Sequence, residues 1–162
     1  LPLDVALDAF PTARFNIDVK SGAAVAAVGQ AVRRTGAESR VLVTSFSALR
    51  LGRAARLLPD AARGVASPGI AAALVAMYLR SGRMLHRALR GASAVQIPER
   101  AGGLDLLSPA RLRAFHRHVP EVHVWTINDP ATMRELLERG VDGLVTDRAD
   151  LAVEVVRSHT NL

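Results

Sequence analysis

The sequence predicts an α/β fold built on a parallel sheet, because short β-branched segments alternate with longer segments rich in Ala, Leu and Arg. No turn signal joins two strand segments directly, so we expect helical crossovers between parallel strands. A chain of 162 residues is long enough for one domain, and we expect residues 1–162 to form a single domain. Hydrophobic residues make up 49% of the chain and charged residues 22%, as is typical of a folded protein.

The period of the apolar residues predicts six strands, at 14–19, 41–45, 64–66, 94–97, 122–126 and 143–146. It predicts seven helices, at 3–10, 23–35, 48–58, 70–89, 109–118, 131–139 and 151–158. Ser108-Pro109 and Asp129-Pro130 each place a capping residue before a proline, which marks the start of a helix. Gly140 follows the sixth of these helices and marks its end.

Polar residues stand at the carboxyl ends of nearly every predicted strand. They are Asp18 and Lys20, Thr44 and Ser45, Gln96, Trp125 with Asn128, and Thr146 with Asp147. An open doubly wound sheet gathers such groups only at its switch point, whereas a barrel brings all strand ends to one face. We therefore favour a (β/α)8 TIM barrel over an open sheet. A full barrel needs about 250 residues, so only about six of its eight βα units fit here.

Lys20 is the only lysine among 21 basic side chains, all the others being arginine. In the segment 15–20, Asn16, Asp18 and Lys20 alternate with apolar residues, so a strand would carry the three polar groups on one face. A compact, titratable ammonium beside a carboxylate and an amide indicates a site or a solvated face. A simple ion pair between Asp18 and Lys20 is the structural alternative.

A net charge of +6 has two interpretations. It could mark a surface for nucleic acid or anionic lipid. Alternatively, the arginines are scattered over solvated helices, and we favour this second interpretation because no block of five like charges occurs and no aromatics interleave them. We therefore expect no nucleic-acid partner.

Several classes of protein are excluded by composition. The chain has no cysteine, which excludes disulfides, thiolate catalysis and zinc–thiolate sites. The longest apolar run, 70–79, is too short to span a bilayer, so no transmembrane segment is expected. No signal peptide opens the chain, and we expect a cytoplasmic protein while leaving export open. The absence of an initiator Met indicates a processed or truncated product.

The last third of the chain carries a specific resemblance. The segments 122–130 (VHVWTINDP) and 140–147 (GVDGLVTD) resemble the closing two units of the glycerophosphodiester phosphodiesterase family. The segment 15–20 (FNIDVK) resembles that family's third-strand motif, and Thr44-Ser45-Phe46 resembles its fourth-strand motif. Residues 93–98, with Gln96 and Pro98, resemble the sixth-strand region. The resemblance therefore runs along the whole chain.

This resemblance implies a barrel of the phospholipase C-like phosphodiesterase type. It implies metal-dependent hydrolysis of glycerophosphodiesters to glycerol 3-phosphate and an alcohol, a reaction of lipid metabolism. Asp18 matches a metal ligand for Mg²⁺ or Ca²⁺, and Lys20 matches the catalytic lysine that faces the phosphate. Trp125 matches the wall of the glycerol pocket, while Phe46 and Gln96 are further expected substrate contacts. A small glycerophosphodiester is the expected partner.

One departure from the family limits this expectation. The His-Arg, Glu-x-Asp and second His motifs of the family's first two strands, which supply acid/base histidines and metal ligands, are absent from this sequence. We therefore expect the isolated chain to be inactive. A non-catalytic binding module and a basic anion-binding domain remain the alternative functions. Because an incomplete barrel leaves open strand edges, we expect a dimer or an N-terminal segment that closes the barrel. Asp147 is expected to cap a helix or anchor a loop.

Overall fold

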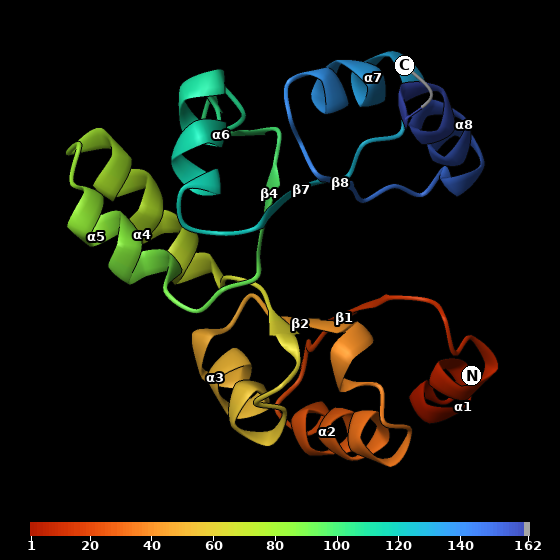
Figure 1. Ribbon diagram of the computed structural model, residues 1–162. Coiled ribbons are helices and arrows are strands. Elements are labelled where there is room, and N and C mark those ends of the chain that lie inside the picture. The colour runs from red at the N-terminus through yellow and green to blue at the C-terminus, as the bar shows by residue number, and fades with distance from the viewer. Residues whose placement is uncertain (161–162) are drawn as a thin grey trace. The chain divides into compact units, whose positions relative to one another are not determined.

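The computed structural model describes residues 1–160 and divides them into two compact units, residues 1–93 and, from residue 94 onward, the rest of the chain. The first unit contains helices α1 to α5 and strands β1 to β3, and the second contains strands β4 to β8 and helices α6 to α8 (Figure 1). The expectation of a single domain stays a prediction, so each unit is described by itself.

A parallel sheet of three strands, in the order β1-β2-β3, forms the centre of the first unit. Its strands are β1 (Phe15–Asp18), β2 (Val41–Thr44) and β3 (Ala62–Arg63). Ile17 pairs with Val43, which places Asp18 beside Thr44 at the carboxyl end. Between the strands lie α2 (Ala24–Arg34), a 3₁₀ turn (Glu38–Arg40) and α3 (Ala48–Leu57). The sequence-based prediction of a parallel sheet with helical crossovers is confirmed in this unit.

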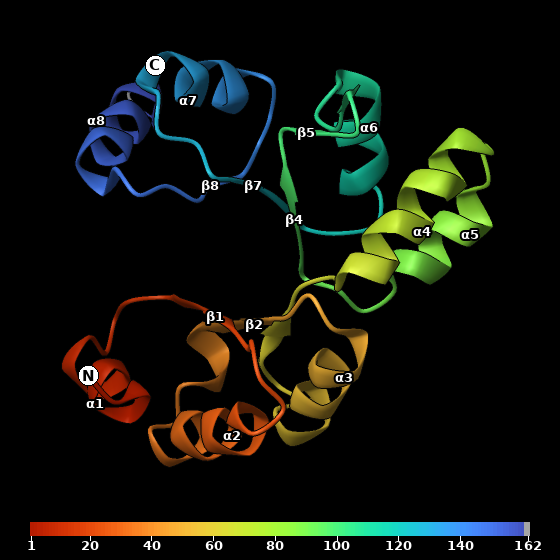
Figure 2. The ribbon, with the colours of Figure 1, turned by 180° about the vertical axis from the view of Figure 1, so that it is seen from behind.

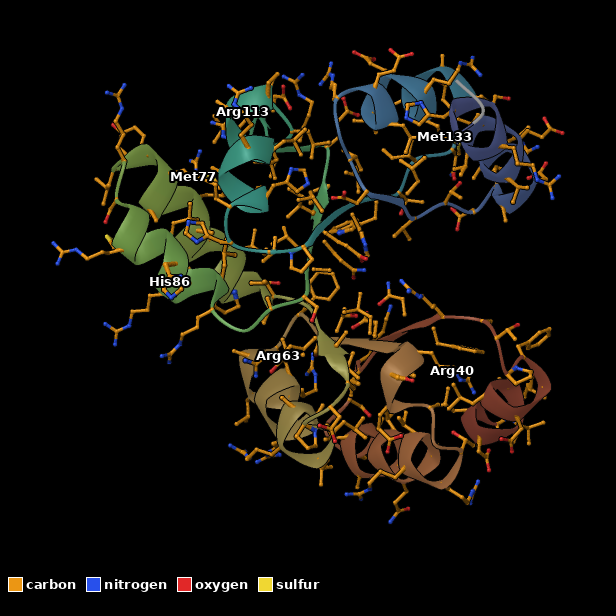
Figure 3. The ribbon with its side chains drawn as sticks, in the orientation of Figure 1. Arg40, Arg63, Met77, His86, Arg113 and Met133 are labelled. Carbon is orange, nitrogen blue, oxygen red and sulfur yellow. The ribbon has the colours of Figure 1, made fainter. Side chains whose placement is uncertain are left out.

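Helix α1 (Leu3–Ala9) is held to the first unit by Arg40, which Figure 3 labels. The Arg40 guanidinium donates to the carbonyl oxygens of Leu7, Phe10 and Ala13, at 2.6, 3.1 and 3.2 Å. Its carbon centre also lies 5.5 Å from the centroid of the Phe15 ring. One planar cation therefore satisfies three carbonyl groups at the end of α1 and beyond it.

The single helix predicted at 70–89 is wrong, because the structure has two helices, α4 (Ser67–Tyr78) and α5 (Gly82–Leu89). They lie side by side as a helical hairpin in both views (Figures 1 and 2). The break falls at Arg80, whose φ is 51°. Ser81 then caps α5, its side chain accepting from the Met84 N–H. The third strand also lies at Ala62–Arg63 instead of at 64–66.

The second unit contains a parallel sheet in the order β4-β7-β8. Its strands are β4 (Ala94–Pro98), β7 (Glu121–Trp125) and β8 (Gly143–Leu144). The helices are α6 (Pro109–His116), α7 (Pro130–Glu138) and α8 (Ala149–Thr160). An antiparallel hairpin of β5 (Arg100–Ala101) and β6 (Leu104–Asp105), next to α6 in Figure 2, was not predicted.

Each unit has buried apolar residues of its own. In the first, Leu7, Val19, Val32, Val41 and Leu58 belong to one cluster between the sheet and its helices. In the second, strand residues such as Val95 and Val124 are buried together with Leu112, Phe115 and Met133 from the helices. Val19, Val41, Val95 and Val124 are all on strands or at their ends, so the strands supply part of the buried core of each unit.

Candidate functional site

The carboxyl end of β1 carries the polar face that the sequence predicts. Asn16, Asp18 and Lys20 are exposed, whereas Phe15 and Ile17 are partly buried and Val19 is buried. Lys20 Nζ lies 3.8 Å from Asp18 Oδ2, and the lysine side chain is 83% exposed. The pair therefore exists, but its ammonium remains open to an anion from solvent.

Hydrogen bonds from Ser45 and Arg50 hold the backbone just after β1 in place. The buried Ser45 hydroxyl donates to the Val19 carbonyl oxygen at 2.7 Å. Arg50 Nε donates to the same carbonyl at 3.0 Å and to Ser45 Oγ at 3.1 Å. Thr44 Oγ1 lies 3.4 Å from the Ile17 carbonyl oxygen. Thr44 and Ser45 therefore bond the backbone of β1, and the N-cap of α3 is Ser47.

Phe46 lies directly after Ser45 and is 57% exposed. Its carbonyl oxygen accepts from the Ser67 N–H at 3.2 Å, which joins the loop after β2 to the start of α4. An exposed ring held by a bonded backbone is suited to contact a ligand at the same strand edge, as the sequence predicts for Phe46.

In the second unit, Gln96 and His123 lie side by side on neighbouring strands. Gln96 Nε2 is 3.1 Å from His123 Nδ1, and His123 Nε2 is 2.9 Å from Glu121 Oε2. Gly143 follows in the same row, and a Cβ there would lie 2.5 Å from His123 Cδ2. The glycine is needed because a side chain at this position would clash with the imidazole. The sequence predicted Gln96 but gave His123 and Glu121 no role.

Trp125 ends β7 on the same face as His123 and is partly buried. The loop after it is bonded to the loop after β8 through Asn128. Asn128 Oδ1 accepts from Thr146 Oγ1 at 2.8 Å and from the Asp147 N–H at 2.9 Å. Asn128 Nδ2 donates to Asp147 Oδ2 at 3.3 Å. Asp147 therefore anchors a loop, the second of its two predicted roles.

Asp142 joins three elements at the opposite end of this sheet. Its Oδ2 accepts from the Val122 N–H at 2.7 Å and lies 2.8 Å from His116 Nε2. The Asp142 N–H donates to the Val122 carbonyl oxygen at 3.0 Å. Asp142, the first of two aspartates in the segment 140–147, is therefore a structural residue, and the sequence alone gave it no role.

The described residues do not form a metal site by themselves. No group of three or more His, Asp or Glu side chains among residues 1–160 could hold a metal ion. Asp18 supplies one carboxylate, whereas Mg²⁺ and Ca²⁺ take six or more oxygen ligands. The donor set in this part of the chain therefore does not fit a resident divalent ion.

The structure brings Asp18, Lys20 and Phe46 to one sheet end in the first unit, and Gln96 and Trp125 to one sheet face in the second. Arg50 and His123 are the residues in these sites that the sequence did not predict. Arg50 lies in the first turn of a helix and reaches a strand through a long side chain, so no local pattern marks it.

Parallel strands with helical crossovers and polar strand ends define an α/β protein of the class whose sites lie at the carboxyl ends of strands. The family model of the glycerophosphoryl diester phosphodiesterase family matches residues 5–151. The chain belongs to this family, and the family predicted from its motifs is confirmed. Among residues 1–160, no helix is long and apolar enough to cross a bilayer.

Relatives with names and structures agree with this assignment. The "Probable glycerophosphodiester phosphodiesterase 2" of Mycobacterium tuberculosis is 41% identical over 155 residues, covering 95% of this chain and 59% of that protein. The chain thus spans about three-fifths of the length of this relative.

Solved structures share the fold at lower identity. A glycerophosphodiester phosphodiesterase from Agrobacterium tumefaciens matches with a TM-score of 0.71 and 23% identity, over 96% of this chain and 61% of that one. A phosphodiesterase from Oleispira antarctica, solved with the product sn-glycerol-3-phosphate, matches with a TM-score of 0.68 and 19% identity, over 96% and 60%. These likenesses show the α/β fold, and the completeness of a barrel is a separate question.

Proposed function

We propose that this chain is the phosphate- and glycerol-binding part of a glycerophosphodiester phosphodiesterase, whose barrel is longer than these 162 residues. The observation that carries the proposal is Lys20, an 83% exposed ammonium at the end of β1 in a chain of that family. The chain supplies about six of the eight βα units of a (β/α)8 barrel in this proposal. The reaction is hydrolysis of a glycerophosphodiester to glycerol 3-phosphate and an alcohol.

Lys20 acts on the non-bridging oxygens of the phosphodiester. Negative charge gathers on these oxygens in the transition state, and a fixed ammonium lowers the energy of that state more than the energy of the bound substrate. Asp18, at 3.8 Å, holds the ammonium near the strand end. Arg50 and Ser45 fix the Val19 carbonyl between these two residues and so limit movement of the strand end.

The other predicted residues bind the remainder of the substrate. Trp125 offers an aromatic wall at the end of β7 for the glycerol carbons, and Phe46 offers a second wall at the end of β2. Gln96 contributes an amide on β4. The product named in the Oleispira antarctica structure, sn-glycerol-3-phosphate, has the phosphate and glycerol groups that this set of side chains would contact.

Asp18 is proposed as one oxygen ligand of a Mg²⁺ or Ca²⁺ ion in the longer barrel. Because the described residues hold too few ligands for such an ion, the isolated chain is proposed to be inactive. Each three-stranded sheet of residues 1–160 has two edge strands, and a closing segment or a second copy is proposed to cover edges of this kind.

The test compares the isolated chain with a chimera that carries the N-terminal units of the Mycobacterium tuberculosis relative. Release of glycerol 3-phosphate from glycerophosphocholine is measured with and without Mg²⁺ or Ca²⁺. We expect turnover only by the chimera with metal, and a loss of about 100-fold or more in the chimera with Lys20→Ala. Turnover by the isolated chain would contradict its proposed inactivity.

Arg53→Ala on α3 is the matched control in the chimera, because it removes an exposed cation away from the strand ends. It should leave turnover unchanged. If Lys20→Ala and Arg53→Ala lower turnover equally, Lys20 does not contact the phosphate. Light scattering of the isolated chain tests whether a second copy covers the strand edges. If the chain is a monomer, the dimer is ruled out and a closing segment is the remaining proposal.

A further inference from the structure

The α4–α5 hairpin has a surface that neither fold nor proposed reaction explains. The outward stripe of α4 consists of Ala71, Ala72, Val75 and Tyr78, and Leu79 directly after the helix continues it, all of them exposed. These positions recur at the helical period, so one side of the helix shows only apolar and aromatic groups to solvent. A helix that is apolar on all sides is normally buried in a protein core or in a lipid.

The exposure is greatest at the tip of the hairpin, where α4 turns into α5. Tyr78 is 86% exposed, Leu79 56%, Val75 51% and Met84 44%. A tyrosine next to aliphatic residues is typical of groups that lie at the boundary between water and hydrocarbon.

The charge around this tip is entirely positive. No Asp or Glu occurs between Asp60 and Glu99, whereas this segment holds five arginines, at positions 63, 80, 83, 87 and 90. Arg80 and Arg83 flank the tip, and Arg83, Arg87 and Arg90 follow one another at the helical period, all exposed. Side chains with nitrogen ends extend outward from α5 around the labelled His86 (Figure 3).

Arg80 is held in a backbone conformation that arginine disfavours. The Arg80 N–H donates to the Met77 carbonyl oxygen at 3.1 Å, and the Ser81 N–H to the Ala76 carbonyl oxygen at 2.9 Å. This pattern ends a helix with a left-handed residue, usually glycine. The chain instead places a cation there, with φ 51°. Strain of this kind is typical of functional positions.

We propose that the tip of the α4–α5 hairpin docks on the surface of a membrane that contains anionic phospholipid. Val75, Tyr78, Leu79 and Met84 enter the boundary between headgroups and acyl chains, while Arg80, Arg83 and Arg87 contact the lipid phosphates. Exposed apolar groups combined with clustered arginines match such a surface in both hydrophobicity and charge. Nucleic acid would match only the charge, and a second copy of this basic hairpin would repel the first.

The first experiment measures co-sedimentation of the 162-residue chain with vesicles of phosphatidylcholine alone or mixed equally with phosphatidylglycerol. We expect binding to the mixed vesicles only, and weaker binding at high salt. The double variant Arg80→Gln/Arg83→Gln should weaken binding roughly 30-fold, since each arginine near an anionic surface contributes a several-fold increase in affinity. Tyr78→Ser/Leu79→Ser should weaken it at least as much.

The matched control is Arg53→Gln/Arg56→Gln on α3, which makes the same change in net charge at two exposed arginines outside the hairpin. It should leave binding within about two-fold, because contacts with the lipid act over short range. Equal weakening by both arginine pairs would overturn the proposal, and so would a failure of the wild-type chain to bind mixed vesicles.

The second experiment locates the contact. Because the chain has no cysteine, Leu79→Cys and Leu104→Cys each create one site for an environment-sensitive fluorophore. Leu104 is also exposed, at 53%, and lies outside the hairpin. A blue shift on adding mixed vesicles at position 79 but not at 104 supports the proposal. No shift at 79, or equal shifts at both sites, overturns it.

Two further outcomes would replace the proposal. If the chain binds duplex DNA but not vesicles, and Arg80→Gln/Arg83→Gln weakens the DNA binding, the surface is assigned to nucleic acid. If the chain does not bind vesicles but forms a dimer in sedimentation velocity, and Tyr78→Ser/Leu79→Ser dissociates this dimer, the surface is assigned to a second copy of the chain.

Discussion

Arg63 and Gly91 lie in direct contact, with Arg63 Nε donating to the Gly91 carbonyl oxygen at 2.5 Å. The Ser93 N–H in turn donates to the Arg63 carbonyl oxygen at 2.8 Å. A side chain at position 91 would occupy the space of the Arg63 guanidinium. Gly91 also has φ of 75°, in the left-handed region. These two constraints fix the end of the α4–α5 hairpin to β3.

Gly91→Ala should therefore lower the free energy of unfolding by about 2 kcal/mol, through backbone strain and displacement of Arg63. Denaturant unfolding measures the change. Gly52→Ala is the matched control, because Gly52 lies within α3 and its Cβ would meet nothing within 4 Å. That variant should raise the free energy of unfolding by about 0.5–1 kcal/mol. Equal effects of both variants would contradict the role of Gly91.

Much of this fold follows from local sequence patterns. The strands at 41–44 and 121–125 and their helices are where the apolar periods predict them. The α4–α5 break was missed although Ser81-Gly82 is a turn signal, because the left-handed residue that ends α4 is Arg80 instead of a glycine. The β5–β6 hairpin was missed although Gly102 and Gly103, both with positive φ, form its turn.

Residues of the candidate site could be predicted only where they follow the alternation of polar and apolar residues along a strand or match a motif of the family. Asp18 and Lys20 were found because alternation places polar groups on one face of β1. Arg50 was not found, because its contact with Val19 joins residues 31 apart in sequence. His123 was not found because its contact with Gln96 depends on the register of β4 and β7.

The neutral His123 ring is expected to be the tautomer with its proton on Nε2. Gln96 Nε2 can only donate, so His123 Nδ1 accepts from it and His123 Nε2 donates to Glu121. Long-range ¹H–¹⁵N NMR correlations of the imidazole distinguish the two tautomers. A ring protonated on Nδ1 alone would contradict this arrangement and imply that the Gln96 amide is reversed.

Removal of His123 should also cost stability. His123→Ala leaves the Gln96 amide without its partner and opens space over Gly143, so the free energy of unfolding should fall by about 2 kcal/mol. His159→Ala on α8 is the control, because His159 is exposed, and its effect should stay within about 0.5 kcal/mol. If the two substitutions cost the same, the contacts of His123 do not stabilise the fold.

Arg80→Gly separates strain from function in the hairpin. Glycine adopts positive φ without steric cost, so this variant should raise the free energy of unfolding by about 1 kcal/mol. It should weaken binding to anionic vesicles at the same time, because a cation is lost from the tip. Arg83→Gly, within α5, removes the same charge but should lower the free energy of unfolding by about 0.5–1 kcal/mol. A loss of stability in Arg80→Gly would show that Arg80 is held by contacts and not by strain.

Asp129 should make the stability of α7 depend on pH. The N–H of Thr132, and next its hydroxyl, donate to the Asp129 carboxylate and lower its pKa below the usual value of 3.8. A lowered folded-state pKa means that the stabilisation is complete above the unfolded-state pKa and is lost as pH falls through the folded-state pKa. Asp129→Ala should lower the Tm by about 2–4 °C near pH 7, because the cap is lost.

Asp129→Asn tests the charge without removing the cap, since asparagine also caps helices well. The Tm of the wild type should exceed that of Asp129→Asn near pH 7, because a carboxylate at a helix N-terminus interacts favourably with the helix dipole. The difference should disappear between about pH 5 and pH 2 as the carboxylate is protonated. Thermal unfolding of the wild type and both variants over this pH range provides the measurement. A Tm difference between the wild type and Asp129→Asn that persists at the lowest pH would show that the cap geometry, and not the charge of Asp129, stabilises α7.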